Sequence, residues 1–294
     1  MFNLCPSPLE KVAEGRMRSL QHKENIMPKL LVKPKKGDGR VTHVTPKSAK
    51  WKYVGFDVFK TPKGKIAKGL EAKRETCLVF VSGKGKVTVD GKDFGVIGDR
   101  MSPFEGKPWS VYVPPGVKWS VTATTEMVLG VCSAPAKGKH EARIIPPDGL
   151  SQEIRGKGSN TRHVTNILPE QDPLAESLLV VEVITPNGNT SSYPPHKHDK
   201  DNLPKESYLE ETYYHRINPP QGFAFQRVYT DNRKLDEAMA VEDGDVTLVP
   251  KGYHPCATVH GYDLYYLNVM AGPTRTWKFH NAPEHEWLMP KPTK

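Results

Sequence analysis

The chain has 294 residues and a formal net charge of +9, from 42 Lys and Arg against 33 Asp and Glu. Apolar residues make up 37% and aromatic residues 9%, which is enough for packed cores and excludes a disordered chain. No stretch approaches the roughly 20 consecutive apolar residues that span a bilayer. Because the length is about twice that of a usual domain, we expect two domains or one large unit.

The charge is distributed unevenly between the two halves. Residues 1–150 carry 27 basic and 14 acidic residues, whereas residues 151–294 carry 15 and 19. The lysines of the first half are scattered rather than grouped with arginines and aromatics, so we expect a solvated surface and no nucleic-acid or membrane partner. The four cysteines form no Cys-x-x-Cys pair. This favours a cytoplasmic protein without a disulfide framework.

The N-terminal residues 1–26 contain no continuous apolar core of the kind found in a secretory signal. We expect them to form a flexible extension, with an ordinary N-terminal helix as the alternative. A new run of residues begins at Met27. The first domain is therefore predicted to begin there.

Short runs rich in Val, Tyr, Phe and Thr follow, separated by Gly and Pro. They occupy residues 77–97, 109–134, 178–186, 223–230, 245–259 and 263–272. This spacing predicts an all-β sandwich or barrel. Residues 235–244 have a short helical pattern, and residues 135–175 are poor in strand-forming runs. We expect the latter to connect two β domains.

The two halves repeat one ordered pattern: an acidic residue before a strand, a Gly-Asp turn and a Pro-x-Gly turn. The first half contains Glu75, Gly98-Asp99 and the turn at residues 114–119, and the second contains Glu210-Glu211, Gly244-Asp245 and the turn at residues 250–254. This order indicates a duplicated small barrel.

The strongest chemical signal is His196-Lys197-His198, preceded by two prolines. Histidines at positions i and i+2 of a strand point to the same face, as two ligands of one metal must. The Glu210-Glu211 pair and His254 lie downstream and complete a set of donors for one divalent ion. These donors suit Zn, Fe(II), Mn, Co or Ni without distinguishing them. The alternative is a group of surface or hydrogen-bonded core histidines.

These motifs resemble those of the cupins, and within them the 5-deoxy-glucuronate isomerases of bacterial myo-inositol catabolism. The matching segments are residues 45–59, 155–164, 192–199, 206–231, 235–256 and 261–287. The resemblance implies a bicupin, with two jelly-roll β-barrels in one chain. Residues 27–150 would form a degenerate, metal-free barrel, and residues 151–294 a linker and the metal-binding catalytic barrel.

The sequence departs from the general cupin pattern at three places. One residue separates Gly252 from His254 where two are usual, and an insertion at residues 199–209 is expected to form a loop at the rim of the site. Trp119 stands where the first half would carry its histidine, and an indole cannot ligate a divalent ion. We therefore expect the first barrel to be structural, packing against the second or completing a homo-oligomer interface.

The resemblance implies an aldose–ketose isomerisation, which converts 5-deoxy-D-glucuronate to 5-dehydro-2-deoxy-D-gluconate by proton transfer or hydride shift. The implied ligands of one divalent metal are His196, His198, Glu211 and His254, with Glu211 favoured over Glu210 by the spacing to the following aromatics. A metal-dependent dioxygenase and a non-catalytic sugar-binding cupin are the alternatives.

Strand alternation gives the candidates for proton transfer. If Glu211 faces the metal, then Tyr213 and His215 face the same interior and Glu210 points away; in the opposite register Glu210, Thr212 and Tyr214 face inward. The predicted catalytic set is Glu210, Tyr213 and His215. Arg227 is the first candidate for binding the substrate carboxylate and Lys251 the second, because this group needs a cation.

Overall fold

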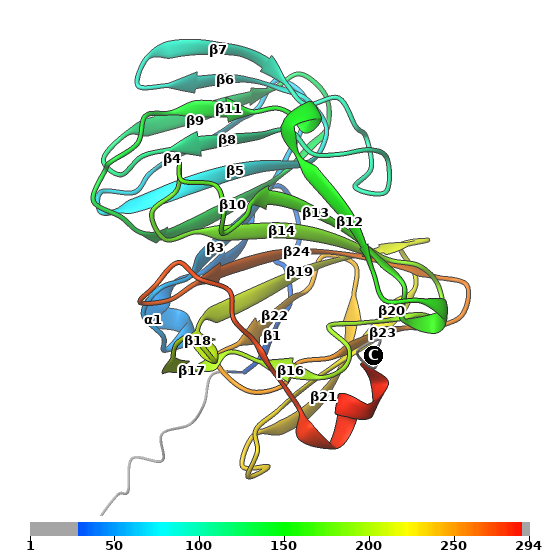
Figure 1. Ribbon diagram of the computed structural model, residues 1–294. Helices are drawn as coiled ribbons and strands as arrows, with labels where there is room; N and C mark the ends of the chain where they lie inside the picture. The colour runs from blue at the N-terminus through cyan, green and yellow to red at the C-terminus, as the bar shows by residue number, and fades with distance from the viewer. Residues whose placement is uncertain (1–28, 290–294) are drawn as a thin grey trace, which may run out of the picture.

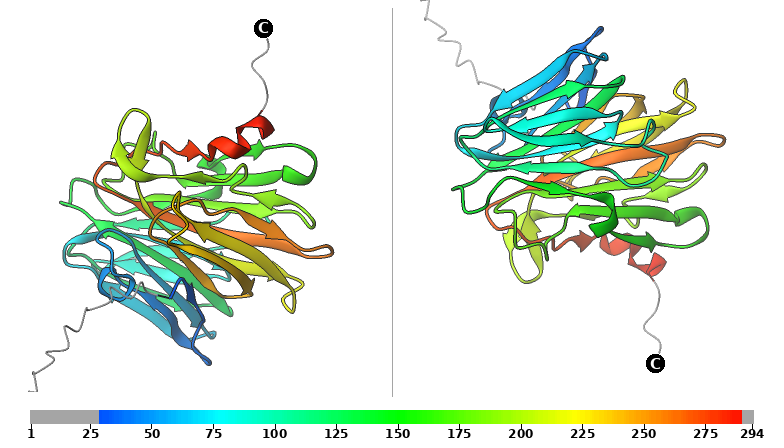
Figure 2. Two further views of the ribbon diagram at one scale, coloured as in Figure 1. Left: turned by 90° about the horizontal axis from the view of Figure 1, so that it is seen from below. Right: turned by 90° about the horizontal axis from the view of Figure 1, so that it is seen from above.

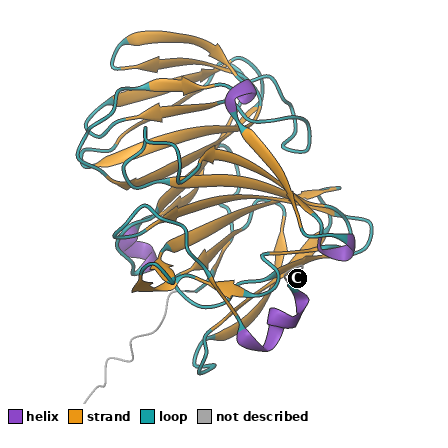
Figure 3. Cartoon of the chain, in the orientation of Figure 1, coloured by secondary structure: helices purple, strands orange, loops and turns teal. Residues whose placement is uncertain are grey.

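The computed structural model describes residues 29–289, so the extension predicted for residues 1–26 lies outside the described residues. Strands dominate this part of the chain (Figure 3). Its helical segments are short: α1 (Pro46–Ala49) and the 3-10 turns η1 (Pro147–Gly149), η2 (Gly158–Asn160) and η3 (Pro283–Leu288). The prediction of an all-β, cupin-like chain is confirmed, with open two-sheet sandwiches in place of closed barrels.

The N-terminal half contains two antiparallel sheets. The six-stranded sheet has the order β11 (Arg143–Ile145), β8 (Ser110–Val113), β5 (Arg74–Ser82), β10 (Met127–Pro135), β3 (Gly55–Thr61) and β2 (Gly39–Val44). The four-stranded sheet has the order β4 (Ile66–Leu70), β9 (Lys118–Ala123), β6 (Gly85–Val89) and β7 (Lys92–Ile97).

The C-terminal half repeats this arrangement. Its seven-stranded sheet has the order β1 (Leu31–Val32), β22 (Val246–Val249), β19 (Glu210–Asn218), β24 (Asp263–Ala271), β14 (Leu179–Thr185), β13 (Arg162–Leu168) and β12 (Ser151–Arg155). Its four-stranded sheet has the order β15 (Thr190–Ser191), β23 (Cys256–Thr258), β20 (Phe223–Tyr229) and β21 (Asp236–Glu242). Two short pairs join β16 (His196–Lys197) to β25 (His280–Asn281) and β17 (Asp199–Asn202) to β18 (Glu206–Tyr208).

The four sheets form layers, with the two large sheets face to face in the middle (Figure 1). One core lies between the large sheets and combines residues of both halves, including Phe56 with Tyr214 and Val81 with Leu267. The central strands β5, β10 and β24 are therefore buried on both faces, which explains their continuous apolar runs. Gly130 lets the two large sheets pack closely, because a Cβ there would meet Leu267 Cδ2 at 2.9 Å.

Two further cores fill the space between the large and small sheet of each half. The N-terminal one is apolar and includes Trp119, Phe80 and Leu129. The C-terminal one includes Tyr213 and Tyr266. Strand β1 crosses between the halves, since it precedes the N-terminal sheets in sequence but pairs with β22 of the C-terminal sheet.

Two buried carboxylates join the halves by reciprocal contacts. Glu75, at the start of β5, accepts hydrogen bonds from the backbone N–H groups of residues 176–178, which lead into β14. Glu210, at the start of β19, accepts from the N–H groups of residues 52–54, which lead into β3. Each half therefore caps the segment that leads into the equivalent strand of the other.

Two predictions about secondary structure were wrong. Within residues 235–244, β21 (Asp236–Glu242) is a strand, because pairing with β20 turns Met239 and Val241 inward with a period of two, which overrides the local helical preference. Residues 135–175 contain β11, β12 and β13, so this segment is part of both large sheets as well as the connection between them. In residues 29–289, no helix has the length and apolar character needed to cross a membrane.

Candidate metal centre

Three histidines of the C-terminal half form a cluster. One potential ligand atom from each of His196, His198 and His254 lies within 4.8 Å of the others, so the group could hold a metal ion. The ring centroids of His196 and His254 are 4.8 Å apart, and those of His198 and His254 are 5.0 Å apart. His198 and His254 are buried, whereas His196 is partly exposed. The His-x-His segment and the turn before β23 therefore meet at one point.

Glu211 is the carboxylate of this cluster. Its Oε2 lies 3.1 Å from His198 Nε2 and 3.2 Å from His254 Nε2. The register of β19 pairs Glu211 with Val249 on one side and Met270 on the other. Strand alternation then turns Glu211 toward the interior of the C-terminal half and Glu210 toward the N-terminal half.

The tautomers of two histidines suit metal binding. His198 Nδ1 lies 3.0 Å from the Leu209 carbonyl, and His254 Nδ1 lies 2.8 Å from the Gly252 carbonyl. Because a carbonyl only accepts, both Nδ1 atoms carry a proton, and both Nε2 atoms face Glu211. An unprotonated Nε2 and a carboxylate oxygen are both acceptors. At 3.1–3.2 Å from each other, such a pair is stable only with a cation or a proton between the two atoms.

The histidine protonation states agree with this interpretation. Burial, with smaller contributions from neighbouring histidines, lowers the pKa of His254 to about 3, and His254 Nε2 is buried without a hydrogen-bond partner. Desolvation opposes protonation of His198, but the hydrogen bond and charge of Glu211 outweigh it and raise the pKa of His198. A divalent cation would satisfy the orphaned nitrogen and the carboxylate together, so these residues fit a metal.

A buried network of ion pairs around Lys197 connects the segments that carry the histidines. Lys197 lies between the two histidines and is 2% exposed, and its Nζ lies 2.7 Å from Asp199 Oδ1 and 3.2 Å from Glu206 Oε1. Asp199 Oδ2 also accepts a hydrogen bond from the Gly252 N–H at 2.9 Å. The network thus ties the His-x-His segment to the turn that carries His254. Sequence reasoning missed Lys197, because a lysine between two ligands gives no sign that it is buried.

Hydroxyl groups line the interior beside the histidines. The Tyr213 hydroxyl lies 2.9 Å from Ser192 Oγ, and the Tyr266 hydroxyl lies 3.0 Å from Ser191 Oγ. The Tyr213 ring centroid is 5.8 Å from that of His254. Burial, followed by the charge of Glu211, raises the pKa of Tyr213 well above its usual value. Tyr213 therefore retains its proton at neutral pH and can donate it in a hydrogen bond.

His215 lies behind Tyr213, with the two rings stacked at 6.0 Å. Its Nε2 is 3.1 Å from both Gln226 Oε1 and Thr247 Oγ1, and burial lowers the pKa of His215 to about 3. A neutral, fully buried ring in this position holds the tyrosine in place and does not reach the cluster directly.

Three predicted residues lie away from the cluster. Glu210 is fully buried, and its carboxylate is occupied by the three N–H groups of the other half, so it cannot serve the histidine site. Arg227 points outward from β20 and forms a bidentate pair with Asp236, with both distances 2.7 Å. Lys251 is exposed beside the buried Gly252. Arg227 on its strand and Lys251 on its turn therefore face outward, away from the histidines.

The insertion at residues 199–209 forms an antiparallel pair, β17 with β18, and starts directly at the cluster with Asp199.

A cavity of about 330 Å³ is lined by Arg155, Asn166, Trp277 and Phe279, among others. The ring of Phe279 is 4.7 Å from that of His196, so this cavity adjoins the cluster.

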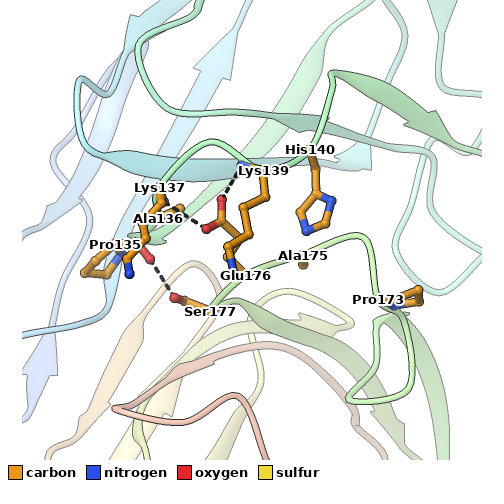
Figure 4. A pocket seen from close by; sticks show the side chains of 9 residues that line it. All are labelled: Pro135, Ala136, Lys137, Lys139, His140, Pro173, Ala175, Glu176 and Ser177. Atoms are coloured by element: carbon orange, nitrogen blue, oxygen red, sulfur yellow. Dashed lines mark hydrogen bonds between the residues drawn. The ribbon is translucent and has the colours of Figure 1, made fainter.

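A second cavity, of about 520 Å³, lies where the two halves meet (Figure 4). It is lined by His140, Glu176 and Ser177, among others. The Glu176 carboxylate accepts hydrogen bonds from the backbone N–H groups of residues 137–139, and the Ser177 hydroxyl donates to the Pro135 carbonyl. The Glu176 and Ser177 side chains are therefore occupied by hydrogen bonds to the backbone, which connect the two halves beside this cavity.

The KduI/IolB family profile matches residues 30–288. The chain belongs to the KduI/IolB family. It is 56% identical over 253 residues to the 5-deoxy-glucuronate isomerase of Geobacillus kaustophilus, covering 86% of this chain and 91% of that protein. The corresponding isomerase of Bacillus subtilis strain 168 is 50% identical over 250 residues, covering 85% of this chain and 92% of that protein. The resemblance inferred from the sequence is confirmed.

Solved structures agree with this family membership. The crystal structure of an IolB-like protein from Salmonella typhimurium is 52% identical and has a TM-score of 0.87, covering 88% of this chain and 99% of that chain. Oxalate decarboxylase of Bacillus subtilis is similar in fold alone, with a TM-score of 0.59 at 13% identity, covering 89% of this chain and 81% of that chain.

Proposed function

We propose that this protein is a metal-dependent 5-deoxy-glucuronate isomerase of inositol catabolism, converting the aldose to 5-dehydro-2-deoxy-D-gluconate. The observation that carries the proposal is the identity of 50% and 56% to isomerases of this name over most of the chain. The three-histidine cluster with Glu211 supplies a site suited to the reaction. The buried free thiols Cys77, Cys132 and Cys256 agree with a cytoplasmic enzyme.

His196, His198, His254 and Glu211 would hold one divalent ion, whose identity these nitrogen and oxygen donors leave open. When bound, such an ion supplies a Lewis acid that stabilises negative charge on the carbonyl and neighbouring hydroxyl of an aldose. Neutral histidines are the form that can ligate, and the lowered pKa of His254 keeps it in that form at neutral pH.

Tyr213 is proposed to donate a hydrogen bond to a substrate oxygen. Its raised pKa keeps the hydroxyl protonated, and Ser192 lies within hydrogen-bond distance of the same hydroxyl. Donation toward an oxygen on which charge develops lowers the barrier more than it stabilises the bound sugar. His215 acts as a positioning residue, because it stacks on Tyr213 and is itself held by Gln226 and Thr247.

The test is incubation of purified protein with 5-deoxy-glucuronate, with NMR detection of the ketone product. We expect turnover that is lost on chelation and restored by a divalent ion. His196→Ala should lose turnover with an unchanged circular dichroism spectrum, whereas substitution of the exposed His260 should change neither. Absence of turnover at full metal occupancy would refute the proposal, and oxygen uptake with an aromatic substrate would favour a dioxygenase instead.

A further inference from the structure

Two arginines occupy paired positions on neighbouring strands beside the metal centre. Arg155 ends β12, Arg162 begins β13, and the two are direct partners in the sheet. Val164 follows Arg162 by two residues and belongs to the core inside the C-terminal half. Because alternate residues of a strand share a face, Arg162 is turned toward the same interior.

The two arginines differ in how their charges are balanced. Arg155 Nη2 lies 2.6 Å from Glu153 Oε1. Arg162 is partly buried, its Nη1 donates to the Asn160 carbonyl at 3.1 Å, and in residues 29–289 it forms no ion pair with a carboxylate. A partly buried guanidinium with free donors is a ready site for an anion.

The turn that carries Arg162 is tied to the segment that leads to the metal ligands. Asn160 Nδ2 donates to the Tyr193 carbonyl at 3.1 Å, and the Thr190 hydroxyl donates to Asn160 Oδ1 at 3.0 Å. The hydroxyls of Ser191 and Ser192, which pair with Tyr266 and Tyr213, lie on this same segment. Guanidinium, hydroxyls and histidines are therefore held in fixed positions relative to one another.

The cavity connects Arg155 with the histidine cluster. Arg155 and Phe279 both line it, and Phe279 packs against His196. The C-terminal segment that ends in η3 runs beside β12 and β13 in both views of Figure 2 and closes this side.

We propose that Arg162, assisted by Arg155, binds the carboxylate of the sugar acid whose carbonyl end lies at the histidine cluster. This inference rests on the proposed function and names the group that makes the site specific for an acidic sugar. The hydroxyls of Ser191, Ser192 and Tyr266 would then face the hydroxyls in the middle of the substrate. Arg162 thus takes the carboxylate-binding role for which the sequence offered Arg227 and Lys251, whose side chains lie on the outside.

The kinetic test uses Arg162→Gln and Arg162→Lys with two substrates, 5-deoxy-glucuronate and the neutral aldose that has a hydroxymethyl group in place of the carboxylate. For the acid, we expect Arg162→Gln to lower kcat/KM by about 10- to 100-fold, mainly through KM, and Arg162→Lys to recover part of it. Turnover of the neutral sugar and metal content should stay unchanged. The control is Arg40→Gln, which removes an exposed arginine of the N-terminal half.

An equilibrium measurement separates this inference from the proposed function. Calorimetry should show that the metal-loaded protein binds D-glucuronate more tightly than D-glucose, and that Arg162→Gln removes this preference. If the wild-type protein lacks isomerase activity but shows this preference, the proposed function fails and the anion site stands. The inference is overturned if the wild-type protein has no such preference, if Arg162→Gln lowers turnover of both sugars equally, or if Arg227→Gln is the variant that raises KM for the acid.

Discussion

The two halves of this protein share a scaffold and differ in what faces their interiors. Their large sheets have equivalent strand orders, and Glu75 and Glu210 form equivalent contacts across the interface. The residue after each glutamate points inward, and it is Thr76 in the first half and Glu211 in the second. The contacts between sheets can thus be kept while the chemistry is confined to one interior.

The N-terminal interior is filled where the C-terminal interior holds its histidines. Trp119 is 5% exposed and packs against Phe59 with the ring centroids 6.1 Å apart. Gly69 makes room for it, since a Cβ there would lie 2.6 Å from the indole ring. The first half therefore fills this volume with a packed side chain, and the second places the proposed metal ligands in the corresponding volume.

The largest expected effect comes from Trp119→Ala. Removing a buried indole leaves a cavity and should lower the free energy of unfolding by about 3–5 kcal/mol, as measured by urea denaturation. Metal content should be unchanged, because the proposed ligands belong to the other half. Loss of metal in this variant, with the fold retained, would break the division of roles between the halves.

His254→Ala should lower metal binding and turnover and leave the stability of the fold almost unchanged. Loss of one ligand is expected to reduce turnover by about 100-fold, about 2.7 kcal/mol, and to lower the metal bound per chain, as measured by elemental analysis. The urea midpoint of the metal-free protein should hardly change. Full metal occupancy in His254→Ala would show that the cluster is not the site.

Glu75→Gln and Glu210→Gln should have matching, smaller effects. A carboxamide accepts with one oxygen only, so each variant leaves at least one backbone N–H unsatisfied at the interface and should cost about 2 kcal/mol of stability. Turnover should remain once the protein is folded. If Glu210→Gln abolished turnover at unchanged stability, Glu210 would have the catalytic role that the sequence first indicated.

The effect that is smallest near neutral pH is a difference between the wild-type protein and His215→Gln in sensitivity to acid. Burial lowers the pKa of His215 to about 3, below the usual histidine pKa of about 6.5, so the unfolded chain binds one more proton between these values. Stability from this residue is present above about pH 6.5 and is lost as the pH falls, by about 1.4 kcal/mol per unit. Urea unfolding at about pH 6, 5 and 4 should show a shallower slope for His215→Gln. An identical slope would mean that His215 is protonated in the fold.

The sequence by itself determined the β class and the relatedness of the halves. Turn residues and strand-forming runs depend on local backbone preferences, which are visible without neighbours. The His-x-His spacing and the turn before His254 are likewise local, and they led directly to residues that lie together in the structure. The helical pattern of residues 235–244 misled because pairing with β20 decides the conformation of that segment.

Only the tertiary structure decided which charged groups face the candidate metal centre. The register of β19 turned Glu211 inward and directed Glu210 to the other half. The same level of structure buried Lys197 and turned Arg162 toward the interior, while Arg227 stayed on the surface. A charged side chain looks alike in sequence whether it is solvated or buried with a partner. Its role is fixed by strand register and by what the opposite sheet supplies, and both are long-range properties.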